Sequence, residues 1–269
     1  MKNERIYLTE DKRAFLDAYI SDEKGAPREA MLIFPGGGYK SVCTEREGEP
    51  IALAYLEFGY NAFVLNYRVG EPTDLYPTQL TDAITALLTV KRNAERFNIR
   101  PERVFAVGFS AGGHLAGSLG LAYKNRELLD SLNVSTEDVK LNGVVLSYPV
   151  VSALKLSHSI SFERLTGLPF DKIPNEIKVK YSLEEQIDEN SPPALIWHTA
   201  RDTTVPPIGS FTLAAKYVEL GIPVSFHVYP YGSHGLALAT EATSTPGALP
   251  EPLAERWLLD SVDFLKTVK

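Results

Sequence analysis

The chain contains a Gly-x-Ser-x-Gly motif formed by Gly108, Ser110 and Gly112. It lies between the apolar run 104–107, which is typical of a buried strand, and the small residues 113–117, which can begin a helix. In a tight strand-to-helix turn the serine backbone is strained, and glycines two residues away on each side let strand and helix pack together. The motif therefore predicts a nucleophilic Ser110 at the edge of a sheet. The alternative is an ordinary glycine-rich turn of a βαβ unit.

Asp202 and His234 are candidates to activate that serine. A serine hydroxyl is a poor nucleophile at neutral pH, so it needs an imidazole base, and the imidazole needs a carboxylate that fixes its tautomer and stabilises its cation. Asp202 follows the apolar run 194–199, and His234 follows the run 224–229. Both fall at carboxyl ends of predicted strands, the edge where Ser110 also lies. We interpret the three as a catalytic triad, although Asp202 alone would be interpreted as a turn aspartate.

The other four histidines are weaker candidates for the base. His114 lies four positions after the serine on the predicted helix, where a packing or hydrogen-bonding role is expected. His198 and His227 lie inside predicted strands and are expected to be structural. His158 lies in the polar segment 152–193, where we expect solvent exposure. The histidine after the last strand therefore remains the predicted base.

The loop 35–38 offers a second source of backbone donors, because it follows the apolar run 30–34 and contains three consecutive glycines. Glycines expose their amides without side-chain obstruction. Gly37 and Gly38, together with the amide of Ala111 at the start of the helix after the serine, are the predicted oxyanion hole. The alternative is a tight turn without chemistry. A phosphate loop is not indicated, since no Lys-Ser or Lys-Thr pair follows the glycines.

The elements that must position these residues are predicted from apolar runs with helical patterns between them. Runs that are apolar on both faces favour a mostly parallel sheet with helices on each side, an α/β fold. The predicted strands contain 30–34, 62–65, 104–107, 144–146, 194–197 and 224–229. Helical periods occur at 80–97, at 211–220 with Phe211, Ala214, Ala215 and Val218 on one face, and at 253–265. Alternation in 14–19 predicts antiparallel edge strands near the N-terminus.

One segment interrupts this rhythm. Residues 152–193 carry scattered serine, proline and charged residues where a short crossover would suffice. We interpret the segment as a small cap inserted into the fold, and the alternative is a solvated loop with a helix or two. The length of 269 residues lies within the range of one large α/β domain, so residues 1–269 are predicted to form a single domain.

Composition limits the possible partners. The net charge of -7 gives no basic face for nucleic acid or for an anionic membrane surface. The charged N-terminus lacks a signal-like apolar region, and no apolar run reaches the length of a membrane span, so a cytoplasmic protein is expected. Cys43 is the single cysteine, so no internal disulfide can form. It is expected to be structural or incidental, and the alternative is a reactive thiol near the site. Neither a metal nor a cofactor is expected, since Cys/His ligand spacing is absent.

Taken together, these motifs resemble those of the α/β-hydrolase esterases with a Gly-Gly-Gly oxyanion loop, closest to the acetyl-xylan-esterase and feruloyl-esterase-like branch. The resemblance is carried by segments in the family's order along most of the chain: 35–39, 45–52, 108–116, 191–193, 197–206 and 233–239. It implies that Ser110 is the nucleophile, Asp202 the residue that orients the histidine, and His234 the base. Pro35 stands where the family usually has a histidine that braces the glycine loop.

The expected activity is that of a serine carboxylesterase acting on small acyl esters without a cofactor. The resemblance implies acyl groups on sugars or oligosaccharides as substrates. The segment 152–193 has no long apolar stretch, which favours short acyl chains, and its Ser157, His158 and Ser159 suit a polar alcohol. Two alternatives remain: an amide or peptide hydrolase, arylformamidase-like or oligopeptidase-like, on the same scaffold, and a ligand-binding homologue without turnover. The sequence implies no particular oligomeric state.

Overall fold

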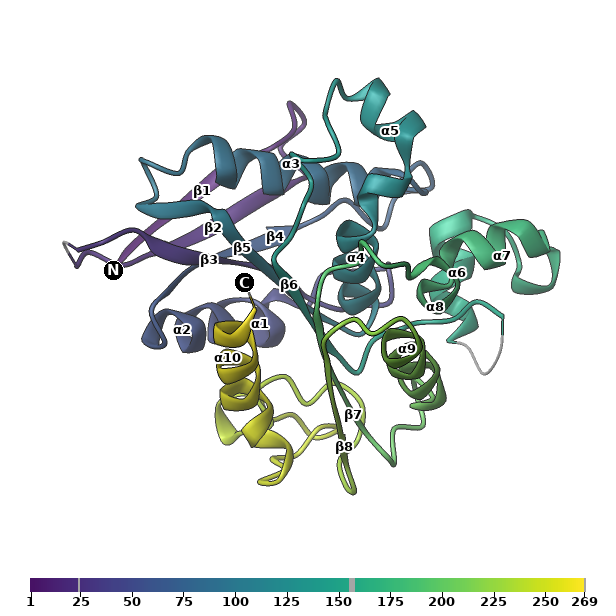
Figure 1. Ribbon diagram of the computed structural model, residues 1–269. Coiled ribbons are helices and arrows are strands. Elements are labelled where there is room, and N and C mark those ends of the chain that lie inside the picture. Colours follow the sequence, from purple (N-terminus) through teal and green to yellow (C-terminus); the bar gives the residue numbers. More distant parts are fainter. Residues whose placement is uncertain (24, 155–157, 269) are drawn as a thin grey trace.

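The computed structural model describes residues 1–23, 25–154 and 158–268, so Ser157 lies outside the described residues. Within this part the chain forms a sheet with the strand order β1-β2-β4-β3-β5-β6-β7-β8 (Figure 1). Its strands are β1 (Lys2–Tyr7), β2 (Phe15–Ile20), β3 (Arg28–Phe34), β4 (Tyr60–Asn66), β5 (Ile99–Phe109), β6 (Gly143–Ser147), β7 (Ala194–Thr199) and β8 (Val224–Tyr229).

The sheet is mostly parallel, as the sequence predicts. Strands β3 to β8 run in one direction, and β2 pairs antiparallel with both β1 and β4. The parallel strands contain all the apolar runs that the sequence analysis predicts as strands, because helices cover both faces of these strands. Every residue of β7 is buried, for example. The alternating N-terminal segment forms the antiparallel edge.

Two layers of helices enclose the sheet (Figure 1). One face is covered by α2 (Glu49–Glu57) and α10 (Trp257–Thr267), and the other by α3 (Thr78–Arg92), α4 (Ala111–Gly120) and α9 (Ile208–Glu219). Successive strand residues face opposite layers, so Leu32 belongs to the core under α3 and α4, while Ile33 belongs to the core under α2 and α10. The shorter helices α1 (Thr44–Glu47) and α5 (Arg126–Ser131) lie in connections.

The buried face of α9 differs from the prediction. Phe211 and Val218 are exposed by 45% and 68%, while Leu213, Ala214 and Tyr217 form the buried face. Ala214 belongs to both sets, and the other buried residues lie one position before the predicted ones, which on a helix turns the contact face by about 100°. Phe211 instead contacts the edge strand, with its ring 5.0 Å from that of Phe226. The helical period at 80–97 also ends early, since α3 stops at Arg92.

The segment between β6 and β7 contains α6 (Ser159–Thr166), α7 (Asn175–Tyr181) and α8 (Leu183–Gln186). Phe162 and Leu165 of α6 and Leu183 of α8 are buried against the core under α4. These helices lie beside α4 and α9 at one side of the molecule (Figure 1). Among the described residues, no helix combines the length and the apolar character that crossing a membrane requires.

Candidate active site

The turn between β5 and α4 holds Ser110 in a strained conformation, with φ 55° and ψ -118°. A Cβ on Gly108 would lie 2.2 Å from the Gly112 carbonyl oxygen, and one on Gly112 would lie 2.1 Å from the carbonyl oxygen of Phe34. Only glycine fits at either position. The predicted reason for the two glycines is therefore confirmed, and the strained turn is the kind of backbone that a packed surrounding must hold in place.

Three side chains from distant parts of the sequence form one hydrogen-bonded relay. Ser110 Oγ lies 2.8 Å from His234 Nε2, and His234 Nδ1 lies 2.6 Å from Asp202 Oδ2. A carboxylate can only accept, so Nδ1 carries the proton, and Nε2 is left to accept from the serine hydroxyl. The structure thus brings together the three residues predicted as nucleophile, base and carboxylate, each just after the carboxyl end of a strand: β5, β8 and β7.

The Asp202 carboxylate has partners beyond His234. Its Oδ1 accepts from the amides of Thr204 and Val205, both at 2.9 Å, and its Oδ2 lies 3.1 Å from His198 Nε2. Burial raises the pKa of Asp202, but hydrogen bonds from His198 and His234 outweigh it and hold that pKa well below its usual range. The carboxylate is therefore charged and fixed in orientation. His198, predicted as a structural residue of a strand, thus also contacts the carboxylate of the relay.

A buried carboxyl group holds the glycine loop through a hydrogen bond. Glu47 accepts from the amide of Gly36 at 2.7 Å and from the hydroxyl of Tyr148 at 2.7 Å. The Tyr148 hydroxyl also accepts from the amide of Ala237, and its ring packs edge-on against His234 at 5.0 Å. Burial raises the pKa of Glu47, and its hydrogen bonds only partly oppose this. One side chain thus ties the loop to the ring that contacts the histidine.

Pro35 does not leave the loop unsupported. Its carbonyl oxygen accepts from the hydroxyl of buried Tyr67 at 2.8 Å. Gly37 and Gly38 adopt φ values of 130° and 61°, which favour glycine. Neither their amides nor that of Ala111 donates to another described residue. The three predicted donors are therefore free to bind an oxygen atom.

Tyr39, the residue after the glycines, connects the loop to α4 and α7. Its hydroxyl lies 2.7 Å from His114 Nδ1, and His114 Nε2 lies 2.8 Å from the carbonyl oxygen of Tyr181. A carbonyl only accepts, so Nε2 donates and Nδ1 accepts from the tyrosine. Burial lowers the pKa of His114 to about 4, which keeps this ring neutral. The predicted hydrogen-bonding role of His114 is confirmed.

The segment between β6 and β7 also reaches the site. Arg164 Nη1 donates to the carbonyl oxygen of Gly38 at 3.0 Å. His158 is half-buried, with its Nδ1 2.8 Å from Ser161 Oγ, so the expectation that it is solvent exposed is wrong. Burial and the neighbouring His234 and Arg164 lower the pKa of His158. Sequence pattern could not show this, because the contact depends on how α6 folds back over the loop.

A pocket of about 260 Å³ opens over Ser110. It is lined by Gly37, Gly38, Cys43, Arg46, Glu47, Ser110, His158, Arg164, Thr204, His234 and Gly235. A molecule bound there would meet a serine hydroxyl with its base and two free backbone amides. Such an arrangement can attack a carbonyl carbon and stabilise the oxyanion that results.

The remaining candidates lie outside the relay. His227 is in β8 with its Nε2 2.8 Å from Ser225 Oγ. Cys43 lines the pocket, where burial raises the pKa of its thiol and keeps it protonated. Within the described ranges, no three His, Cys, Asp or Glu side chains gather in a way that could hold a metal ion.

Glu47, Tyr148, His198 and Arg164 are the site residues that sequence reasoning missed. Two of them left a signal. Glu47 lies in the segment 45–52 that contributed to the resemblance, and His198 lies four positions before the aspartate that it contacts. The contacts of Tyr148 and Arg164 join residues more than a hundred positions apart, and no local pattern reports such pairs.

The strand order, the strained serine turn after β5 and the histidine after β8 define the α/β-hydrolase class. The model of the BD-FAE family matches residues 16–217. The match covers well over half of the chain, and the chain belongs to the BD-FAE family.

Curated relatives and solved structures agree with this class. The chain is 35% identical over 231 residues to endo-1,4-β-xylanase B of Butyrivibrio fibrisolvens, covering 84% of this chain and 35% of that protein. It is 27% identical over 238 residues to an acetylxylan esterase of Xylanibacter ruminicola, covering 87% of this chain and 46% of that protein. The chain thus spans less than half the length of these two relatives. The crystal structure of an acetyl ester-xyloside bifunctional hydrolase from Caldicellulosiruptor lactoaceticus matches with a TM-score of 0.83 and 29% identity, covering 98% of this chain and 96% of that one.

Proposed function

We propose that this chain is a serine carboxylesterase that hydrolyses short-chain acyl esters through an acyl-enzyme. The observation that carries the proposal is the relay from Ser110 through His234 to Asp202, at 2.8 and 2.6 Å, beside free amides of the glycine loop. Geometry of this kind is the signature of an activated serine nucleophile.

In the first half of the reaction Ser110 Oγ bonds to the ester carbonyl carbon while its proton passes to His234 Nε2. The carbonyl oxygen takes the negative charge, which the amides of Gly37, Gly38 and Ala111 stabilise. The carbon–oxygen bond to the alcohol then breaks, and the alcohol leaves with the proton from His234. Asp202 stabilises the imidazolium that forms between the two steps.

In the second half water replaces the alcohol. His234 takes a proton from the water as its oxygen bonds to the acyl carbon, and the same amides stabilise the second oxyanion. Ser110 leaves with the proton held by His234, and a carboxylic acid is released. Apart from the ester and one water molecule, both halves use only groups of the chain.

An acylated sugar is the proposed substrate. The names of two relatives refer to acetylxylan and to an acetyl ester-xyloside activity, and both proteins match this chain over most of its length. The pocket also favours a polar alcohol, because Arg164, His158 and Thr204 lie on its wall. We further propose that residues 1–269 act as a single domain in which 152–193 is the cap.

Ser110→Ala tests the mechanism directly. We expect kcat on aryl acetates to fall about a thousandfold or more, with unchanged thermal unfolding. A fluorophosphonate should label wild type at Ser110 and leave the variant unlabelled. Ser135→Ala, which removes a hydroxyl from an exposed turn outside both pockets, is the control and should keep full activity. Near wild-type turnover by Ser110→Ala would reject the proposal. If the wild-type protein prefers matched aryl amides over esters, the function is amide hydrolysis.

A further inference from the structure

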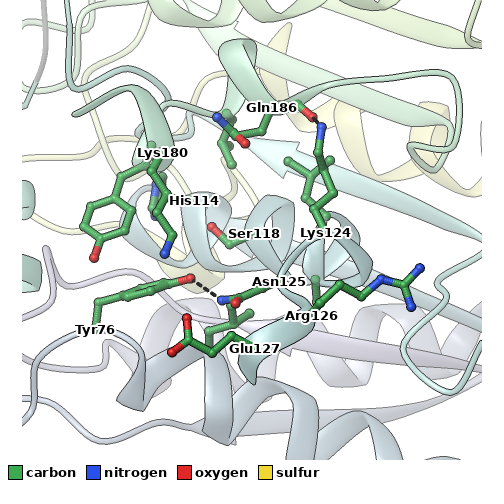
Figure 2. A pocket seen from close by; sticks show the side chains of 14 residues that line it. Tyr76, His114, Ser118, Lys124, Asn125, Arg126, Glu127, Lys180 and Gln186 are labelled. Atoms are coloured by element: carbon green, nitrogen blue, oxygen red, sulfur yellow. Dashed lines mark hydrogen bonds between the residues drawn. The ribbon is translucent and has the colours of Figure 1, made fainter. Parts of the chain in front are cut away.

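A second pocket, of about 340 Å³, shares no lining residue with the one over Ser110. It lies between α4 and α5 on one side and α7 and α8 on the other, with Tyr76 closing a third side (Figure 2). Its volume is in the range of small-ligand sites. Neither the proposed hydrolysis nor any relative's name accounts for it.

The base of this pocket is apolar and one wall is aromatic. Leu80, Leu121 and Leu183 are buried at its base. The rings of Tyr76 and Tyr181 lie 4.5 Å apart at 45°, and both line the wall. Asn125 donates to the Tyr76 hydroxyl at 2.9 Å, which fixes that ring (Figure 2). The rings offer a rigid apolar surface to a ligand with an apolar face.

The rim carries hydrogen-bond donors and acceptors that have no partner among the described residues. The side chains of Ser118, Arg126, Glu127 and Lys180 line the pocket, and none of these side chains forms a hydrogen bond or ion pair with another described residue. The Lys180 ammonium lies 5.6 Å from the centre of the Tyr76 ring. By contrast, Lys124 is occupied, since it donates to the Gln186 carbonyl oxygen at 2.6 Å. The free set comprises a hydroxyl, a carboxylate, an ammonium and a guanidinium.

We propose that this pocket binds a neutral mono- or disaccharide. A sugar has hydroxyls that both donate and accept, which match a rim of free donors and acceptors, and apolar C–H faces that match the tyrosine wall. A small anion would meet Glu127, and a small cation would meet Lys180, so neither fits the whole rim. The proposal concerns binding only and does not depend on turnover at Ser110.

The test titrates the Ser110→Ala variant of the full chain with xylobiose while backbone amide signals are followed by NMR. We expect saturable shifts around Leu121 and Asn125 with a dissociation constant of about 1 to 10 mM, as for a small ligand held by a few contacts. Benzoate at the same concentrations should leave these signals in place. Because turnover is absent, failure of the esterase proposal would leave this result unaffected.

Glu127→Ala/Lys180→Ala removes two of the rim charges, both on exposed side chains, and should weaken xylobiose binding about tenfold. Glu137→Ala/Lys140→Ala is the matched control, because it removes an exposed acid and an exposed lysine away from the pocket. Ser118→Leu, which fills the space, should abolish the shifts. The proposal is overturned if xylobiose gives no saturable shifts, if shifts occur only around Gly38 and Gly235, if benzoate binds instead, or if the rim variant binds like its control.

Discussion

At the residue scale, Asp202 serves two histidines at once. Its Oδ2 lies 2.6 Å from His234 and 3.1 Å from His198, while two backbone amides hold its Oδ1. A carboxylate held on all sides cannot rotate away when the imidazole becomes charged. On the proposed mechanism its charge and its orientation act through His234 alone, so the two side chains should behave as a unit.

We therefore expect Asp202→Asn and His234→Ala each to lower kcat about a thousandfold or more, and the double variant to be little worse than His234→Ala. Steady-state kinetics on one aryl acetate measure all three. Asp260→Asn is the control, since Asp260 lies 3.7 Å from His227 in a second histidine–aspartate contact remote from the serine. Effects that multiply, or a mild His234→Ala beside a severe His114→Ala, would contradict the assigned base.

The burial of His114 leads to a prediction about the free energy of unfolding, not about the reaction rate. Its pKa falls from 6.5 to about 4 on folding because the ring is buried, so the folded protein favours the neutral form. The stabilising contribution is then complete above pH 6.5 and is lost as the pH falls toward 4. We expect the free energy of unfolding to drop by about 3 kcal/mol across this window, measured by urea unfolding at several pH values.

His114→Gln is designed to remove that slope and keep the contacts, since an amide can accept from Tyr39 and donate to the Tyr181 carbonyl. Its unfolding free energy should change much less between pH 6.5 and 4. A smaller slope should remain from His158, whose pKa is also lowered. Thr212→Gln, an exposed position on α9 without a titratable group, should retain the wild-type slope. Identical slopes in both variants would count against a neutral buried His114.

The residues that form the relay could be predicted from sequence, and those that support it could not. Ser110, Asp202 and His234 each follow an apolar strand, and parallel strands bring their carboxyl ends to one edge, so local patterns located all three. Glu47 and Arg164 act through contacts with the glycine loop. Those contacts depend on packing between segments far apart in sequence, about which periodicity carries no information.

At the element scale the same contrast applies. The strands were predictable, because a strand buried on both faces must be apolar throughout and leaves a plain signal. The contact face of α9 was not, since apolar residues lie on both of its sides and Phe211 packs on the sheet edge. Only the position of the helix against β7 and β8 decides which side is buried.

The helix α6 makes a testable contribution through Arg164. Its guanidinium donates to the Gly38 carbonyl oxygen at 3.0 Å and so restrains Gly38, whose own amide, in the preceding peptide, is a proposed oxyanion donor. We expect Arg164→Ala to lower kcat about tenfold with a smaller change in KM, because the variant loses one hydrogen bond that orients the loop. Arg164→Lys should recover part of the rate. Lys172→Ala, an exposed cation of the same inserted segment, is the control. A change in KM alone would show that Arg164 binds substrate without positioning the loop.

At the scale of the whole molecule, the pocket over Ser110 belongs to no single element. Its wall combines the connection after β3 with α1, the turn after β5, α6 with the residue before it, the loop after β7 and the loop after β8. Its volume of about 260 Å³ is small for a ligand site, and the loops around it are tied by buried groups such as Glu47. A pocket assembled from five segments has little freedom to lengthen for a larger acyl group.

This shape predicts the acyl preference. Each methylene buried in an apolar pocket contributes roughly 0.8 kcal/mol, so a long-chain enzyme shows kcat/KM rising steadily with acyl length. Here the polar Arg164, His158 and Thr204 share the wall, and the space is limited, so we expect kcat/KM to fall beyond acetyl or butyryl. A series of aryl esters from acetyl to decanoyl measures it, with acetylated xylo-oligosaccharides as the sugar comparison. A value that climbs through the whole series would contradict both the short-chain and the sugar-ester assignments and would indicate a lipase-like pocket that opens in solution.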